Sequence, residues 1–158
     1  MSLLTDKIFY NALKSNAELL AMVGYVAPEG TDPGKPARIY NTSIDVPDEE
    51  LLNEPVPYII IIFDGMQNDG FTKDNDWEGD IDKVQVSIEV TAEDRETLGT
   101  IVTAIRQVVI AYFTNIESTA ADFDLVPDDY TLSAGPIQYD SIKPCYWQTL
   151  TYNCDTKP

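Results

Sequence analysis

The sequence predicts an α+β fold. We expect a two-layer sandwich, in which a mostly antiparallel or mixed sheet of about four or five strands is packed by one long helix and one short N-terminal helix. Three observations predict it. Apolar residues recur at helical spacing over 98–112, apolar and polar residues alternate over 84–90, and a continuous apolar, β-branched run occupies 58–63. A chain of 158 residues has the size of one domain, so 1–158 is expected to fold as a single unit.

The N-terminal region predicts two helices in succession. Residues 3–14 carry an apolar stripe on one helical face, made of Leu4, Ile8, Phe9, Ala12 and Leu13. Ser15 and Glu18 have the spacing of a capping box, which predicts a second short helix through 19–23. Gly24 is expected to end that helix, because glycine often follows the last helical turn.

Two proline-containing connections and two strands follow. Residues 27–36 predict a loop and 38–41 a short strand. The second connection, 47–57, is compatible with one helical turn at 48–52. The strand 58–63 is apolar on both faces, so we expect it to lie centrally, with helices on one face. A chain of this size has little left to cover the other face, which suggests a partner subunit.

The middle of the chain predicts a hairpin and the main helix. Residues 64–82 form a polar, acidic loop or hairpin tip, and 84–90 form a half-buried strand. Thr91 is expected to cap the helix that follows, whose first turn carries acidic residues. One face of this helix holds the apolar residues Leu98, Ile101, Val102, Ile105, Val108, Val109 and Tyr112.

The C-terminal region predicts two closing strands. Residues 115–129 are acidic and loop-like. We expect the two strands within 130–154, separated near Pro136 or Pro144, with 146–152 as the stronger one.

The charge balance argues against nucleic-acid and membrane partners. The chain has 27 acidic and 10 basic residues, a net charge of −17 and no histidine. Binding to phosphate backbones or anionic lipids needs clustered Lys and Arg, whereas the basic residues here are scattered along the chain. The lack of histidine excludes Ser-His and Cys-His nucleophile pairs and histidine metal ligands.

The cysteines and the hydropathy pattern indicate a soluble, intracellular protein. Cys145 and Cys154 lie on one stretch that, as a single strand, would hold them about 30 Å apart, which is too far for a disulfide. The first residues do not resemble a signal peptide, and the longest apolar stretch, 56–63, is too short to span a bilayer.

The acidic segment partly matches a calcium-binding loop. Asp74, Asp76, Glu78, Asp80 and Asp82 would be its acidic residues, with glycine at the sixth position of the register. Two features depart from the pattern, because Gln85 stands where a bidentate glutamate is needed and the flanks read as strands. A solvated hairpin tip explains the acidic residues as well, and no cofactor is expected.

No catalytic site can be nominated from the sequence. Catalytic carboxylates need an apolar pocket and a fixed separation, and the acids here cluster in polar segments. Cys145 has only Lys143 as a nearby cation, so a buried, inert strand cysteine is the better interpretation than a reactive thiol. We therefore expect no enzymatic activity.

The order of the motifs resembles the tail-terminator, or tail-completion, family of long-tailed bacteriophages and prophages. The resemblance covers most of 3–113 and, more weakly, the last strand. It rests on the order and spacing of short motifs: Leu19-Leu20-Ala21-Met22-Val23-Gly24, Arg38-Ile39-Tyr40, Pro57-Tyr58-Ile59-Ile60, Val84-Gln85-Val86-Ser87-Ile88-Glu89-Val90, Thr91-Ala92-Glu93-Asp94-Arg95-Glu96, and the helix 98–113. The acidic segments 64–82 and 115–129 depart from the pattern.

The resemblance implies a structural, non-catalytic role. Such proteins are similar to one another in an α+β fold that assembles into a hexameric ring. The ring caps the tail tube, stops its polymerisation and faces the head–tail connector protein. The implied partners are further copies of this chain, which can be monomeric in solution before assembly, together with the tail tube protein and the connector. The implied location is the bacterial cytoplasm during assembly and then the virion tail.

Two further readings stay open beside a tail structural protein. One is a small intracellular ligand- or calcium-binding module that uses the acidic loop 69–82, and the other is an enzyme with a carboxylate-only site. For a ring, the apolar and aromatic strands are expected to supply side-to-side interfaces. The candidate interface residues are Tyr58, Ile60, Ile62, Tyr146 and Tyr152.

Overall fold

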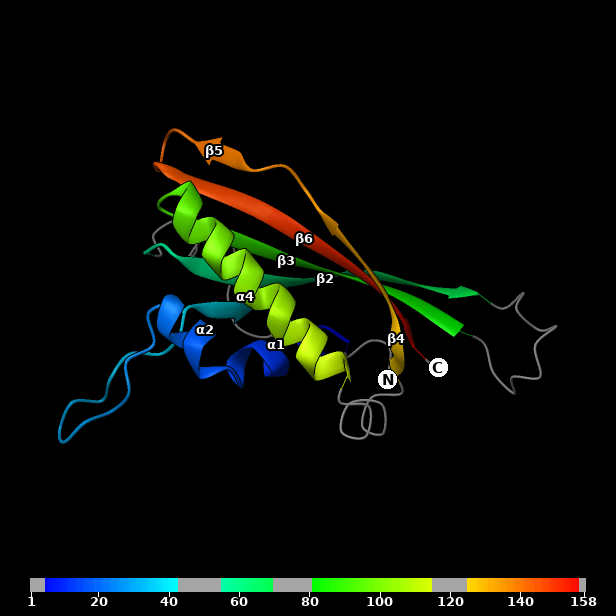
Figure 1. Cartoon of the computed structure of the whole chain (residues 1–158), viewed down its shortest axis with the longest axis horizontal. Coiled ribbons are helices and arrows are strands. Elements are labelled where there is room, and N and C mark those ends of the chain that lie inside the picture. The colour runs from blue at the N-terminus through cyan, green and yellow to red at the C-terminus, as the bar shows by residue number, and fades with distance from the viewer. Residues whose placement is uncertain (1–4, 43–54, 70–80, 115–124, 157–158) are drawn as a thin grey trace.

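The computed structural model describes residues 5–42, 55–69, 81–114 and 125–156 (Figure 1). Three helices and six strands occupy these ranges. The helices are α1 (Thr5–Lys14), α2 (Ala17–Met22) and α4 (Arg95–Thr114). The strands are β1 (Ile39–Asn41), β2 (Tyr58–Asp69), β3 (Ile81–Ala92), β4 (Leu125–Ala134), β5 (Gln138–Asp140) and β6 (Cys145–Thr156).

The strands form one mixed sheet in the order β1-β2-β3-β6-β4, and β5 pairs with β6 beyond the end of β4. β1 and β2 are parallel, and every other pair is antiparallel. The predicted α+β class with a mixed sheet is confirmed. β2 has a neighbour on each side, as expected for a strand that is apolar on both faces.

The C-terminal region departs from prediction in its number of strands. It holds three strands, β4, β5 and β6, because the chain leaves the sheet around both Pro136 and Pro144. β4 begins at Leu125, so the expectation of a loop is wrong for 125–129. The pairing of β4 with β6 is non-local, and an acidic segment without alternation does not reveal it.

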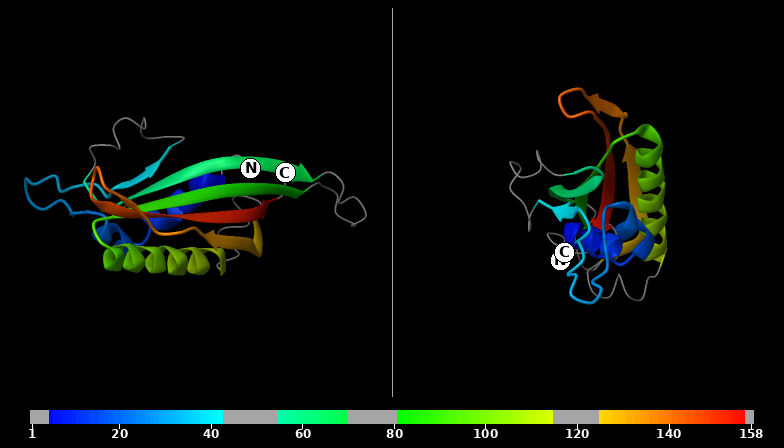
Figure 2. Two further views of the ribbon diagram at one scale, coloured as in Figure 1. Left: turned by 90° about the horizontal axis from the view of Figure 1, so that it is seen from above. Right: turned by 90° about the vertical axis from the view of Figure 1, so that its left-hand side faces the viewer.

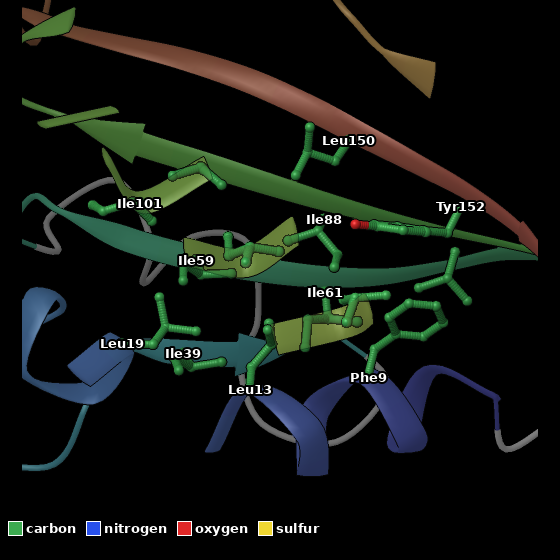
Figure 3. Packing of buried hydrophobic residues seen from close by; sticks show 14 of the residues in the cluster. Phe9, Leu13, Leu19, Ile39, Ile59, Ile61, Ile88, Ile101, Leu150 and Tyr152 are labelled. Carbon is green, nitrogen blue, oxygen red and sulfur yellow. The ribbon is translucent and has the colours of Figure 1, made fainter. Parts of the chain in front are cut away.

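One face of the sheet is packed by the helices. Figure 2 shows α4 running along this face. Ile8, Phe9 and Leu13 of α1 share the core with Leu98, Ile101, Ile105 and Val109 of α4 and with alternate residues of β2, β3 and β6. Figure 3 shows Phe9 and Leu13 directed toward Ile59, Ile61 and Ile88 of the sheet. The predicted apolar faces of the first and the long helix are therefore confirmed.

The helix starts differ from prediction by small shifts. The Asn16 side chain, rather than that of Ser15, caps α2: its Oδ1 accepts a hydrogen bond from the Leu19 amide at 2.9 Å. Asp94, rather than Thr91, caps α4, where its Oδ1 accepts from the Thr97 amide at 2.7 Å. Thr91 lies inside β3, paired with Tyr58 and Trp147. In both cases an Asn or Asp one to three residues further along takes the position, consistent with their strong N-cap preference.

The β2–β3 hairpin is longer than predicted. Strand pairing continues to Asn68↔Asp82 and Asp69↔Ile81, so 64–69 and 81–82 belong to strands and not to a loop. The register shifts between Phe63 and Gly65, because β2 has an extra residue there, Asp64, with no residue of β3 directly opposite it. The Asp64 carboxylate accepts hydrogen bonds from the side chains of Gln85 and Ser87 on β3, which fixes this bulge.

The predicted loop 27–36 belongs to a protruding ribbon, defined here as residues 25–36. Val26 and Lys35 exchange two backbone hydrogen bonds of 2.9 Å, and Glu29 and Asp32 exchange two more, of 3.1 and 2.9 Å. Gly34 has φ +71°, and a Cβ atom there would clash with the backbone oxygen of Val26. The ribbon is thus shaped by its own backbone bonds (Figure 1).

Candidate interface on the open face of the sheet

The face of the sheet opposite the helices carries a groove. Alternation along β2 places Ile59 and Ile61 in the core and Tyr58, Ile60 and Ile62 on the other, open face. The groove has a volume of about 540 Å³. Its lining comes from Thr42, β2, β3 and the region around β5 and the start of β6: Tyr58, Ile60, Ile62, Glu89, Thr91, Asp140, Ile142, Lys143, Cys145 and Trp147.

Strand register explains why these side chains meet. Tyr58 lies opposite Thr91, which in turn lies opposite Trp147, so one row across three strands points to the open face. Ile60 lies opposite Glu89 in the next such row. The groove floor is therefore built by rigid strands and not by loops, which favours a fixed recognition surface.

The turn between β5 and β6 forms one rim of the groove. The Asp140 carboxylate accepts a hydrogen bond from the Ile142 amide at 2.9 Å, and this turn leaves the Ile142 side chain 95% exposed. The ammonium of Lys143 lies 5.4 Å from the centroid of the Tyr58 ring. This cation–π contact connects the rim to the floor.

Burial changes the acid–base behaviour of two groove residues. Desolvation raises the pKa of the Tyr58 hydroxyl, and its hydrogen bond with Thr91 opposes that rise. Desolvation also raises the pKa of the Cys145 thiol, with a further contribution from the negative charge of Asp140. Cys145 is therefore mostly a neutral thiol near pH 7, as expected of an inert strand cysteine.

The structure brings together three of the five predicted interface residues. Tyr58, Ile60 and Ile62 line the groove. Tyr146 lies on the helix side of the sheet, where its ring centroid is 5.1 Å from that of Tyr139. Tyr152 is 1% exposed and packs against Phe9 and Tyr130, so it is a core residue of this chain and not an interface residue.

Sequence reasoning missed Trp147. The even-numbered residues of β6, among them Leu150, Tyr152 and Cys154, belong to the core, so the odd-numbered ones face the other way. The period-two rule could have assigned Tyr152 to the core together with Leu150 and placed Trp147 on the open face. Asp140 at the end of β5 reaches the groove together with Ile142 and Lys143 of the turn that follows, and no local sequence signal indicates that position.

The candidate calcium loop falls mostly outside the described residues. Asp74, Asp76, Glu78 and Asp80 lie there. Asp82 lies in β3, and its carboxylate accepts a hydrogen bond of 2.7 Å from the Asn68 side chain. Gln85 also lies in β3 and not at the end of a loop. Within the described ranges, no three His, Cys, Asp or Glu side chains are grouped so that they could hold a metal ion.

Both cysteines are buried and free, as the strand argument predicts, and they lie near the two ends of β6. No helix in the described parts of the chain is both long and apolar enough to span a membrane.

Comparison with known proteins supports the fold. No protein-family model and no curated protein matches the sequence. Among the solved structures that match is a chain from the virion of a native gene transfer agent particle, at 15% sequence identity and a TM-score of 0.55. The match covers 97% of this chain and 94% of that one. At this identity the similarity shows that the two chains share a fold.

Proposed function

We propose that this chain is a structural protein of a phage-like virion and that it acts there as a tail terminator. In this role, copies of the chain form a ring, a hexamer by the family resemblance. The ring caps the tail tube and joins it to the head–tail connector protein. The chain would assemble in the bacterial cytoplasm and remain in the virion tail. The role is structural and includes no catalytic step.

The observation that carries the proposal is the fold similarity to a gene transfer agent virion chain, which extends over 97% of this chain. The resemblance of the sequence motifs to tail terminators points the same way. The open-face groove supplies what a ring needs, namely an apolar surface that the helices do not cover. Ile60 and Ile62 on its floor lie beside the large aromatic side chains Tyr58 and Trp147, which are typical interface anchors.

The first test is the solution mass of the purified chain across a concentration series, measured by light scattering and combined with negative-stain electron microscopy. We expect a closed ring of fixed subunit number, either in solution or on the ends of tail tubes from the same phage or prophage. A chain that neither forms rings nor binds tube ends would contradict the proposal.

A pair of variants tests whether the groove is an interface. Ile62→Asp places a charge on the groove floor and should abolish ring formation while leaving the far-UV circular dichroism unchanged. Ile110→Asp is the matched control, because Ile110 is also an exposed isoleucine but lies on α4. Equal assembly of both variants would exclude the groove as the ring interface.

A further inference from the structure

We propose that the ribbon, residues 25–36, of one copy docks into the open-face groove of the next copy. This inference rests on the proposed ring and names the two surfaces that would build it. The occupant of the groove is a second copy of this chain, and the contact runs head to tail.

The ribbon has the properties of a preformed docking element. Two pairs of backbone hydrogen bonds hold it, and three prolines restrict its backbone. Its residues are almost all exposed, including the apolar side chains of Tyr25 (41%) and Val26 (47%). An element that is ordered before binding loses little conformational entropy when it binds.

Cross-strand pairing gives the ribbon a mixed apolar and cationic surface. Val26 and Lys35 are direct partners, and direct partners project from the same face of a ribbon. An aliphatic side chain and an ammonium group therefore stand next to each other. The groove has the matching combination, with Ile60, Ile62 and Trp147 on its floor and the carboxylates of Glu89 and Asp140 at its walls.

Both surfaces carry charges of both signs, and each has a net charge of −1. The ribbon carries Glu29, Asp32 and Lys35. The groove carries Glu89, Asp140 and Lys143. Two acids and one base on each side allow Lys35 to approach the groove carboxylates while the ribbon acids approach Lys143. Because the net charge of −17 makes copies repel one another, a contact between two copies needs local pairs of opposite charge, and Lys35 beside Glu89 or Asp140 is such a pair.

The ribbon and the groove are two different surfaces of the chain. Figure 1 shows the ribbon projecting away from the body of the molecule, beyond α2. The groove lies on the open face of the sheet. Since ribbon and groove are different surfaces, their contact is heterologous, and such contacts close into rings when the rotation between neighbours permits.

The decisive experiment mixes two defective chains. Val26→Asp should inactivate the ribbon and Ile62→Asp the groove, so each variant alone should be monomeric at about 0.15 M salt, where distant charges are screened. An equimolar mixture retains one working ribbon and one working groove per pair. We therefore expect heterodimers and no larger species. The Ile110→Asp control should assemble like the unmodified chain.

A crosslink tests the same contact when assembly is weak. A Val26→Cys chain should form an intermolecular disulfide with Cys145 in the groove of a neighbour under mild oxidation. Cys145→Ser in the same chain should abolish it, whereas Cys154→Ser should not, because Cys154 is a core residue. Lys35→Glu should weaken assembly about tenfold, and adding Glu89→Lys should restore it.

The outcomes separate this inference from the proposed function. If Val26→Asp still forms rings and no Cys145 crosslink appears, the ribbon contact is wrong while the ring stands. If Ile62→Asp keeps its rings but no longer binds tube ends, the groove binds another virion protein, which also overturns the inference. If the unmodified chain forms no rings and the Val26→Cys chain forms no crosslink at the highest soluble concentration, the ribbon contact fails. The proposed function fails with it only if the chain also leaves tube ends unbound.

Discussion

The rings of Phe9 and Tyr152 lie with their centroids 5.1 Å apart and their planes at 43° in the centre of the core. Phe9 belongs to α1 and Tyr152 to β6, so this contact joins the first helix of the chain to its last strand. Both side chains are at most 1% exposed. The pair is therefore a contact between the N-terminal and C-terminal regions of the chain, which no local sequence pattern predicts.

Phe9→Ala should destabilise the chain by about 3–5 kcal/mol, because it removes a fully buried ring and leaves a cavity against Tyr152. The measurement is urea unfolding followed by circular dichroism. Tyr25→Ala is the matched control, since it truncates an exposed ring and should change the free energy of unfolding by less than about 0.5 kcal/mol. Similar effects of both substitutions would contradict the packing of α1 on the sheet.

Asp94 should make the stability of α4 acid-sensitive. Its hydrogen bond from the Thr97 amide lowers the pKa of the carboxyl group below its ordinary value. A carboxyl with a lowered folded-state pKa contributes stability above its unfolded pKa of about 3.9 and loses it as the pH falls through the folded value.

The measurement is the thermal midpoint between about pH 2 and pH 7. Asp94→Ala should lower the midpoint at neutral pH and flatten its dependence in the acid range. Asp94→Asn should keep the cap but lose the acid-dependent part, because asparagine also caps helices and does not titrate. A steeper acid dependence in either variant than in the unmodified chain would contradict the assignment.

The two thiols should differ in reactivity. Cys145 lines the groove, whereas burial raises the pKa of the Cys154 thiol to about 12. Because the thiolate is the reactive form, both thiols should react slowly with a maleimide at about pH 8, Cys145 before Cys154. Peptide mass spectrometry over time measures the order. Labelling of Cys154 first would contradict the register of β6.

Calcium should not bind tightly. Asp82 and Gln85, two positions of the candidate loop, lie in β3, and both are engaged in side-chain hydrogen bonds within the hairpin. Isothermal calorimetry should detect no saturable site with a dissociation constant below about a millimolar. A tighter site would revive the calcium-module reading.

Duplex DNA should not bind either, because a chain with a net charge of −17 offers few cations to replace the counterions of the phosphates. An electrophoretic shift assay at low salt is the sensitive test, since low salt favours any electrostatic contact. A retarded band at micromolar protein would be incompatible with a DNA-repelling surface.

The elements that sequence predicts well are those with a strong internal period. Val84, Val86, Ile88 and Val90 alternate with polar residues, and the apolar face of α4 repeats at helical spacing, so β3 and α4 appear where expected. The first half of β4, 125–129, has no such period, and only the pairing of β4 with β6 makes it part of a strand. The candidate site divides in the same way. Tyr58, Ile60 and Ile62 follow from one strand, whereas Asp140 and Lys143 reach the groove through tertiary structure.

The extra residue Asp64 changes which side chains of β2, even-numbered or odd-numbered, face the groove. Before it, even-numbered side chains face the groove; after it, Met66 lies opposite Val84 on the helix side and Gln67 opposite Lys83 on the other. Loss of Asp64 would leave Met66 opposite Val84 and Gln67 opposite Lys83, so the two faces of the outer hairpin would stay as they are and the pairing would become regular. The strand pair thus absorbs an inserted residue locally, and the side chains of the outer hairpin keep their faces whether or not that residue is present.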